Sequence, residues 1–190
     1  LIDIRQKEPL GLGHAVLCAR PAVGNETFGV ILADDLIDSR VPALLQLQRA
    51  CPVRGGSVIA VMEVPRSRVS SYGIVAGRWL DERVMRVRDM VEKPPPGRAP
   101  SRYAIVGRYV LAPRIFELLE RTRRGAQREI QLTDALRALA KEQPVFAVKF
   151  DGTRYDVGTK LGYVEASLAY ALKDPGVGPK VRALLRTLVR

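Results

Sequence analysis

Short apolar runs alternate along the chain with stretches in which apolar residues recur at helical spacing. Continuous or alternating β-branched runs predict strands, and apolar positions on one helical face predict helices. Strands are predicted over residues 2–5, 27–33, 57–64, 72–76, 84–92, 102–111 and 145–150. Helices are predicted over 12–20, 41–50, 113–121, 134–141 and 158–173, the last with Leu161, Tyr163, Val164, Leu168 and Leu172 facing inward. This alternation favours an α/β architecture with a mostly parallel sheet.

The run over residues 27–33 is almost uninterrupted in its apolar character, which predicts a central strand covered on both faces. In open α/β sheets, ligands bind beyond the carboxyl ends of the strands. Polar residues that directly follow apolar strands are therefore the first candidates for a functional site.

The composition is that of a packed domain, with 190 residues of which 47% are apolar and 27% charged. The longest apolar runs have the length of a strand, and the first residues lack the pattern of a signal peptide, so no membrane partner is predicted. Cys18 and Cys51 stand far apart and His14 is the single histidine, which excludes a disulfide scaffold and a cysteine- or histidine-rich metal site. We expect a reduced, cytoplasmic setting.

The chain is strongly basic, with 31 Lys and Arg against 20 Asp and Glu and a net charge of +11. Clustered basic residues would favour nucleic-acid binding through counterion release. The arginines are scattered, however, and aromatic residues make up only 6%, so no base-stacking surface is indicated. We interpret the charge as the surface of an enzyme that handles anions, with no nucleic acid as a partner. Residues 1–175 are expected to form one domain, and 176–190 a basic helix or tail.

Asp34 and Asp35 follow the apolar run over 27–33 directly. Two neighbouring carboxylates at the end of a buried strand repel each other unless a cation lies near. Magnesium with a ligand phosphate would supply that cation, since Mg²⁺ takes one or two carboxylates plus phosphate oxygens. The alternative is that one aspartate caps the next helix and the other is solvated.

Two further stretches carry charged residues at the ends of predicted strands. The loop over 152–160 places Asp156 and Lys160 among glycines before a helix, where an anion is favoured. Asp156 is a candidate second metal ligand and Lys160 a candidate phosphate ligand, against the alternative of a helix-capping Asp156. Glu92 and Lys93 are candidates to bind sugar hydroxyls and a sugar phosphate, against the alternative of an edge ion pair.

The segment over residues 6–16 carries an amide side chain and close glycines. Gln6 and Gly11 are candidates to contact a base, although Val16 replaces the third glycine of the dinucleotide fingerprint. His14 is interpreted as packing or capping. No GxSxG or HExxH pattern occurs, which excludes serine hydrolase and zinc peptidase chemistry of those types.

Five motifs together, in this order, resemble the bacterial UTP–glucose-1-phosphate uridylyltransferase family: RQKEPLGLGHA at 5–15, ADDL at 33–36, YGIV at 72–75, VEKP at 91–94 and YDVGTKLGY at 155–163. The resemblance covers nearly the whole chain. It implies the Rossmann-like three-layer α/β/α nucleotide-diphospho-sugar transferase fold with a mixed, mostly parallel sheet. It also implies a homo-oligomeric transferase that forms UDP-glucose and pyrophosphate from UTP and glucose 1-phosphate with Mg²⁺.

The resemblance assigns a role to each candidate residue. It implies that Gln6 and Gly11 bind uracil and that Asp34 and Asp156 bind Mg²⁺. It also implies that Gly73, Glu92 and Gly107 line the glucose site and that Lys93 and Lys160 bind phosphate. Lys93, Asp34 and Asp156 form the catalytic group. A sugar phosphate with a second pKa of about 6 is largely dianionic near neutrality and attacks the α-phosphorus without a general base. Catalysis then consists of alignment and charge neutralisation.

One family feature has no match in this chain: the glycine-rich loop GxGTRxxPxTK that grips the triphosphate. We therefore expect a fragment that lacks the first strand and the phosphate loop and has little activity alone. Two alternatives stay open. One is another sugar-1-phosphate nucleotidylyltransferase, such as a thymidylyltransferase, and the other is a non-catalytic paralogue that binds nucleotide sugars.

Overall fold

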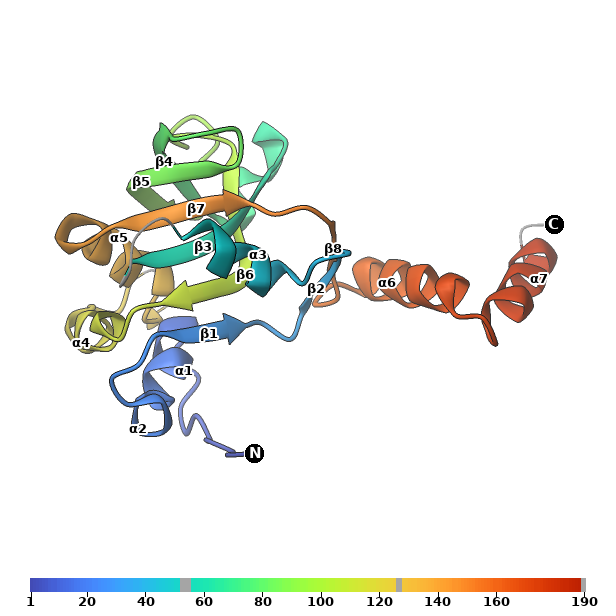
Figure 1. Cartoon of the computed structure of the whole chain (residues 1–190), viewed down its shortest axis with the longest axis horizontal. Helices are drawn as coiled ribbons and strands as arrows, with labels where there is room; N and C mark the ends of the chain where they lie inside the picture. The colour runs from blue at the N-terminus through green and yellow to red at the C-terminus, as the bar shows by residue number, and fades with distance from the viewer. Residues whose placement is uncertain (52–55, 126–127, 189–190) are drawn as a thin grey trace.

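The computed structural model describes residues 1–51, 56–125 and 128–188, and its centre is a mixed sheet between two helical layers (Figure 1). The strand order is β1-β6-β3-β7-β5-β4, and β4 also pairs with β6. The bounds are β1 Phe28–Ile31, β3 Ser57–Glu63, β4 Gly73–Trp79, β5 Val84–Glu92, β6 Tyr103–Leu111 and β7 Val145–Lys149. The strands β3 and β7, which are buried except at their C-terminal ends, carry the β-branched runs that predicted them.

The two faces of the sheet are covered by different helices, because successive side chains of a strand point to opposite faces. Val58 of β3 packs with Leu47 of α3 (Ala43–Ala50) on one face. Ile59 packs with Phe116 and Leu136 on the other face, where α1 (Leu12–Cys18), α4 (Arg114–Arg121) and α5 (Leu132–Glu142) lie. The expected three-layer α/β/α arrangement is confirmed. The short helices α2 (Arg20–Val23) and η1 (Arg66–Ser71) complete the body.

The sheet is mixed, as expected, but the prediction that it is mostly parallel is wrong. Among the described strands, β3–β7 is the one parallel pairing, and the pairings β1–β6, β3–β6, β4–β5, β4–β6 and β5–β7 are antiparallel. A parallel neighbour needs a long crossover, usually a helix. The strands from β3 to β6 follow one another with no α-helix between them, so they pair antiparallel.

The run over residues 27–33 also differs from its prediction as a central strand covered on both faces. Within the described residues, β1 pairs with β6 alone, and Ile31 is 59% exposed. Residues 2–5, predicted as a strand, are exposed and belong to no strand. An apolar run indicates that a strand is hydrophobic, but it does not specify which neighbours the strand has.

A second, two-stranded ribbon extends beyond the main sheet. It pairs β2 (Asp35–Asp38) with β8 (Thr153–Asp156) in antiparallel register, with Asp35 opposite Asp156. Figure 1 shows α6 (Lys160–Lys173) leaving this ribbon away from the sheet, followed by α7 (Gly178–Leu188). Residues 189–190 of the predicted basic tail lie outside the described residues.

The helix α6 does not turn its predicted apolar face inward. Its buried residues are Gly162 and Ala166, whereas Leu161, Tyr163 and Val164 are exposed. Leu168 and Leu172 are half-buried. The prediction of an inward face is therefore wrong for three of its five residues, because helical periodicity marks an apolar face without specifying what covers it. Within the described part of the chain, no helix has the length and apolar character that a membrane span requires.

Candidate active site

A cleft of about 320 Å³ lies where the β2–β8 ribbon meets β4, β5 and β6. Six predicted site residues line it: Asp34, Gly73, Glu92, Lys93, Gly107 and Asp156. A larger groove of about 640 Å³ lies against α3 and the turn after β4, and none of the predicted residues lines it. The convergence of residues from five separate segments identifies the smaller cleft as the candidate site.

Asp34 and Asp156 converge on one point although they are far apart in the sequence. The two strands hold them together, since Val157 N donates to Asp34 O at 2.8 Å. A Cβ on Gly158 would lie 3.4 Å from Asp34 Oδ2 and 3.3 Å from Asp156 Oδ1. The two carboxylates therefore face a spot that carries no side chain.

The alternative interpretations of these aspartates as helix caps are wrong. Residue Asp35 begins the strand β2 and not a helix. At α6 the N-cap is Thr159, whose side-chain oxygen accepts from Gly162 N at 3.1 Å. Neither Asp34 nor Asp156 serves a helix end.

These residues fit a magnesium ion. Asp34 is exposed, and the second oxygen of Asp156, Oδ2, lies 3.4 Å from Arg154 Nη2. One oxygen from each residue then remains for a cation. Among the described residues, no group of three or more His, Cys, Asp or Glu side chains could hold a metal. Mg²⁺ tolerates this, because it takes one or two carboxylates and completes its shell with phosphate oxygens and water.

Asp35 has a structural role that differs from that of its neighbour. It is 5% exposed, accepts from Gly107 N at 2.6 Å and forms a buried ion pair with Arg154. A Cβ on Gly107 would lie 2.7 Å from Asp35 Oδ2, so the approach of the carboxylate requires a glycine there. The predicted sugar residue Gly107 thus lies directly beneath Asp35, where it ties the ribbon to β6.

Arg154 is the main residue that sequence reasoning missed. Burial alone would lower the pKa of its guanidinium, but attraction to Asp35 and a hydrogen bond with it outweigh burial and raise that pKa. Its Nη1 also lies 3.2 Å from the Tyr72 hydroxyl. Arg154 stands two positions before Asp156 in β8, and strand periodicity places such residues on the same face. That spacing was the available signal.

Glu92 and Lys93 enter the cleft together at the end of β5. Residues at consecutive positions of a strand normally face opposite sides, but Lys93 has a φ of 43°, which is outside the strand conformation. Its Nζ lies 3.9 Å from Glu92 Oε1. The other oxygen, Glu92 Oε2, accepts from Thr133 Oγ1 at 2.6 Å. Thr133 is 41 positions from Glu92, and no sequence pattern linked the two.

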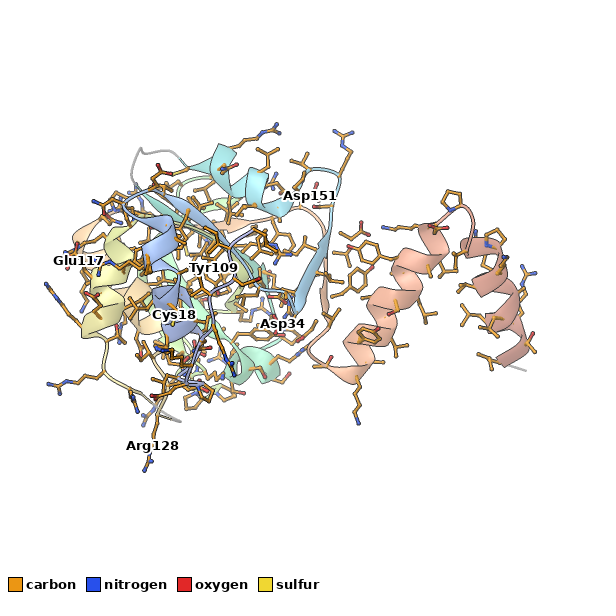
Figure 2. All side chains as sticks on the ribbon, turned by 90° about the horizontal axis from the view of Figure 1, so that it is seen from below. Cys18, Asp34, Tyr109, Glu117, Arg128 and Asp151 are labelled. Carbon is orange, nitrogen blue, oxygen red and sulfur yellow. The ribbon has the colours of Figure 1, made fainter. Side chains whose placement is uncertain are left out.

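The cleft is acidic, although the chain as a whole is basic. Four carboxylates (Asp34, Asp35, Glu92 and Asp156) line it with two cations (Lys93 and Arg154). The buried Tyr109 is affected by this negative charge. Burial, together with the charges of Asp35, Glu92 and Asp34, raises the pKa of its phenol well above the ordinary range. The excess of negative charge favours a bound cation. Figure 2 shows Asp34 and Asp151 at the two ends of the β2–β8 ribbon.

Three predicted residues do not line the cleft. Gln6 precedes α1, and Gly11 is the N-cap of α1, whose first residue Leu12 does line the cleft. Lys160 is the exposed first residue of α6 and has no place among the lining residues. The geometry thus gathers the predicted metal and sugar residues, places the predicted uracil residues beside them, and leaves Lys160 apart.

Comparison with known proteins decides the family. The model of the family described as "Nucleotidyl transferase" matches residues 2–173. The chain belongs to the nucleotidyl transferase family.

The curated relatives of this nucleotidyl transferase are more specific. The chain is similar to the UTP–glucose-1-phosphate uridylyltransferase of Staphylococcus haemolyticus (strain JCSC1435), with 48% identity over 185 residues, 97% of this chain and 64% of the relative. It is also similar to that of Bacillus subtilis (strain 168), with 46% identity over 187 residues, 98% of this chain and 63% of the relative. The chain thus spans just under two thirds of these relatives.

Solved structures agree with this relationship. A UDP-glucose pyrophosphorylase in complex with UDP-glucose is 48% identical with a TM-score of 0.86, and the match covers 90% of this chain and 66% of that chain. A UTP-bound UGPase from Acinetobacter baumannii is 41% identical with a TM-score of 0.83, and the match covers 96% of this chain and 64% of that chain. The expected nucleotide-diphospho-sugar transferase fold is confirmed.

Proposed function

We propose that the protein carrying this chain forms UDP-glucose and pyrophosphate from UTP and glucose 1-phosphate with Mg²⁺. The observation that carries the proposal is the convergence of Asp34 Oδ2 and Asp156 Oδ1 on Gly158, in the cleft that also holds Glu92 and Lys93. A carboxylate pair in a cleft of about 320 Å³ that also holds a lysine suits a reaction between two phosphorylated substrates. The relatives described above carry the name of this activity.

Each residue has a task in the proposed reaction. Gln6 and Gly11 hold uracil, Gly73, Glu92 and Gly107 surround glucose, and Lys93 binds the sugar phosphate with Lys160 as an outer phosphate ligand. Asp34 and Asp156 would hold Mg²⁺, which would supply positive charge to offset the negative charge of the phosphates. The nucleophile needs no general base, since a sugar phosphate with a second pKa of about 6 is largely dianionic near neutrality. Lys93 and Glu92 therefore act by orientation and charge.

The proposal has three further parts. Residues 1–175 act as the nucleotidyltransferase domain, and 176–190 form a separate basic segment. The protein as its gene encodes it is a homo-oligomer. It works in the cytoplasm, in keeping with the absence of a disulfide pattern in a chain with two cysteines.

The proposed function is tested by measuring pyrophosphate release from UTP, glucose 1-phosphate and Mg²⁺ with the protein as its gene encodes it. We expect turnover that stops when Mg²⁺ is chelated and that is faster with UTP than with dTTP. A preference for dTTP would favour a thymidylyltransferase instead. Binding of UDP-glucose without turnover would favour a non-catalytic paralogue.

Replacing Thr133 with valine is expected to weaken the use of glucose 1-phosphate while leaving UTP binding intact. The change keeps the shape but removes the donor to Glu92 Oε2. A hydrogen bond to a charged group contributes about 1.5–3 kcal/mol, so KM for glucose 1-phosphate should rise about tenfold or more, with kcat changed far less. Steady-state kinetics with each substrate varied in turn measures the effect.

The matched control is Thr122→Val, because the Thr122 hydroxyl donates to Leu118 O at the end of α4, outside the cleft. We expect its KM values to stay within about twofold of the original, as for most changes that break no catalytic contact. Equal effects of the two substitutions would contradict the role given to Thr133.

A further inference from the structure

His14, the single histidine of the sequence, takes part in a short hydrogen-bond network with Gln6, Gly11 and Cys18. Gln6 Nε2 donates to Gly11 O at 3.1 Å and lies 2.9 Å from His14 Nδ1. The other ring nitrogen, His14 Nε2, lies 3.8 Å from Cys18 Sγ. Gln6, Gly11 and His14 are each half-buried. Cys18, labelled in Figure 2, lies on α1 together with His14.

The donor and acceptor roles in this hydrogen-bond network follow from the chemical nature of the atoms. A carbonyl oxygen can only accept, so the atom of the Gln6 carboxamide that faces Gly11 O must be the nitrogen. That nitrogen has two hydrogens and no acceptor capacity, so His14 Nδ1 must accept the second hydrogen. The imidazole proton is then on Nε2 and points at the weak acceptor Cys18 Sγ.

The backbone around Gly11 is held in place by close contacts with residues 129 and 130. Gly11 has a φ of 91°, and a Cβ there would lie 2.8 Å from Glu129 Cβ. On either side of it, Gly13 N donates to Ile130 O at 2.9 Å and Ile130 N donates to Leu10 O at 2.7 Å. The acceptor Gly11 O is thus fixed by backbone contacts to a neighbouring segment, independently of Gln6.

Both hydrogens of the Gln6 carboxamide are therefore used within the protein. Among the described residues, Gln6 Oε1 and Gly11 N–H have no hydrogen-bond partner. The carboxamide that contacts Gly11 O thus leaves an acceptor, and Gly11 itself leaves a donor, just before α1, whose first residue Leu12 lines the cleft. Without His14, the carboxamide would keep only one of its two anchors and could rotate.

We propose that His14 is a positioning residue for base selection, which holds the Gln6 carboxamide so that only its oxygen is presented to a bound nucleobase. The proposal rests on the function proposed above, in which Gln6 and Gly11 contact the base. Uracil and thymine carry a ring N–H at N3 next to a carbonyl, which matches an acceptor beside a donor. Cytosine has a lone pair at N3 instead of a hydrogen. It can pair with both Gln6 Oε1 and Gly11 N–H only if the base shifts in its plane, which would displace the ribose.

The first test reads the tautomer directly. Because His14 is the only histidine, the 190-residue chain labelled with ¹⁵N-histidine and purified without a histidine tag gives one set of ring signals. We expect a protonated Nε2 and an unprotonated Nδ1 that correlates with the Gln6 side-chain amide. The opposite tautomer, or a fast mixture of both, would overturn the proposed geometry.

The second test compares two amide substitutions in the protein as its gene encodes it. His14→Asn places an acceptor oxygen at the position of Nδ1, whereas His14→Gln carries the same group past that position toward Cys18. We expect His14→Gln to raise KM for UTP about fivefold and to lower the UTP over CTP preference by a similar factor, the usual effect of one hydrogen bond. His14→Asn should stay within about twofold.

The outcomes separate the two proposals. Normal UTP turnover with an unchanged UTP over CTP preference in His14→Gln would overturn the role of His14 alone. Absence of UTP turnover in the unsubstituted protein would overturn the proposed function and, with it, the base selection inferred here. Thermal unfolding of both variants controls for a general loss of structure. A merely structural role of His14 would change the unfolding temperature and leave the UTP over CTP preference unchanged.

Discussion

Replacing Arg154 with methionine is expected to cost the fold about 3–5 kcal/mol, the usual effect of leaving one partner of a buried ion pair unpaired. The side chains of Arg154 and Asp35 are 12% and 7% exposed. Methionine fills much of the space of arginine but leaves the Asp35 carboxylate without its cation. The free energy of unfolding of the 190-residue chain in urea measures the loss.

Two further variants make this test specific. Arg102→Met removes an arginine that pairs with Glu63 at the surface, where the side chains are 55% and 48% exposed, and should cost less than about 1 kcal/mol. Adding Asp35→Asn to Arg154→Met removes the unpaired charge and should restore part of the loss. If Arg154→Met were no more harmful than Arg102→Met, Asp35 would not depend on Arg154.

Replacing Asp34 with asparagine is expected to leave stability almost unchanged and to remove nearly all proposed transferase activity. Asp34 is exposed and makes no ion pair with another described residue, so the fold loses little. As a metal ligand it contributes several kcal/mol to the transition state, so kcat/KM should fall about a thousandfold. Pyrophosphate release over a range of Mg²⁺ concentrations measures the effect in the protein as its gene encodes it.

The matched control for Asp34 is on the same ribbon. Asp38→Asn alters a carboxylate of β2 that pairs with Lys173 at the surface, away from the cleft, and should leave kcat/KM within about twofold. Asp156→Asn should lose activity as Asp34→Asn does. Wild-type activity in Asp34→Asn, with the same Mg²⁺ requirement, would remove the proposed metal site.

The sequence predicted the acidic part of the site because its signals are local. Asp34 directly follows an apolar run, Glu92 ends a predicted strand, and Asp156 lies in the glycine-containing segment predicted as a loop before a helix. Strand ends and turns are recognisable from a few neighbouring residues. The bounds of β5 were predicted without error for the same reason.

The features that the sequence did not predict depend on tertiary contacts. Thr133 reaches Glu92 across the fold, and Arg154 reaches Asp35 at a separation of 119 positions. The direction of the strands depends on the connections between them, which is why a mixed sheet with one described parallel pair replaced a mostly parallel one. The exposure of Leu161 on α6 likewise depends on what lies opposite it.

The neighbouring residues Asp34 and Asp35 have different surroundings, because Asp34 belongs to the turn before β2 and Asp35 is the first residue of that strand. Both residues line the cleft, but Asp35 is 5% exposed and accepts from Gly107 N, whereas Asp34 is exposed. A slip of β2 by one residue against β8 would exchange the two, and would place the solvent-facing carboxylate above the Gly107 amide. The position of the two carboxylates thus depends on the register of the four-residue strand β2 against β8. An Asp-Asp pair in a related sequence is therefore not sufficient evidence of an active enzyme.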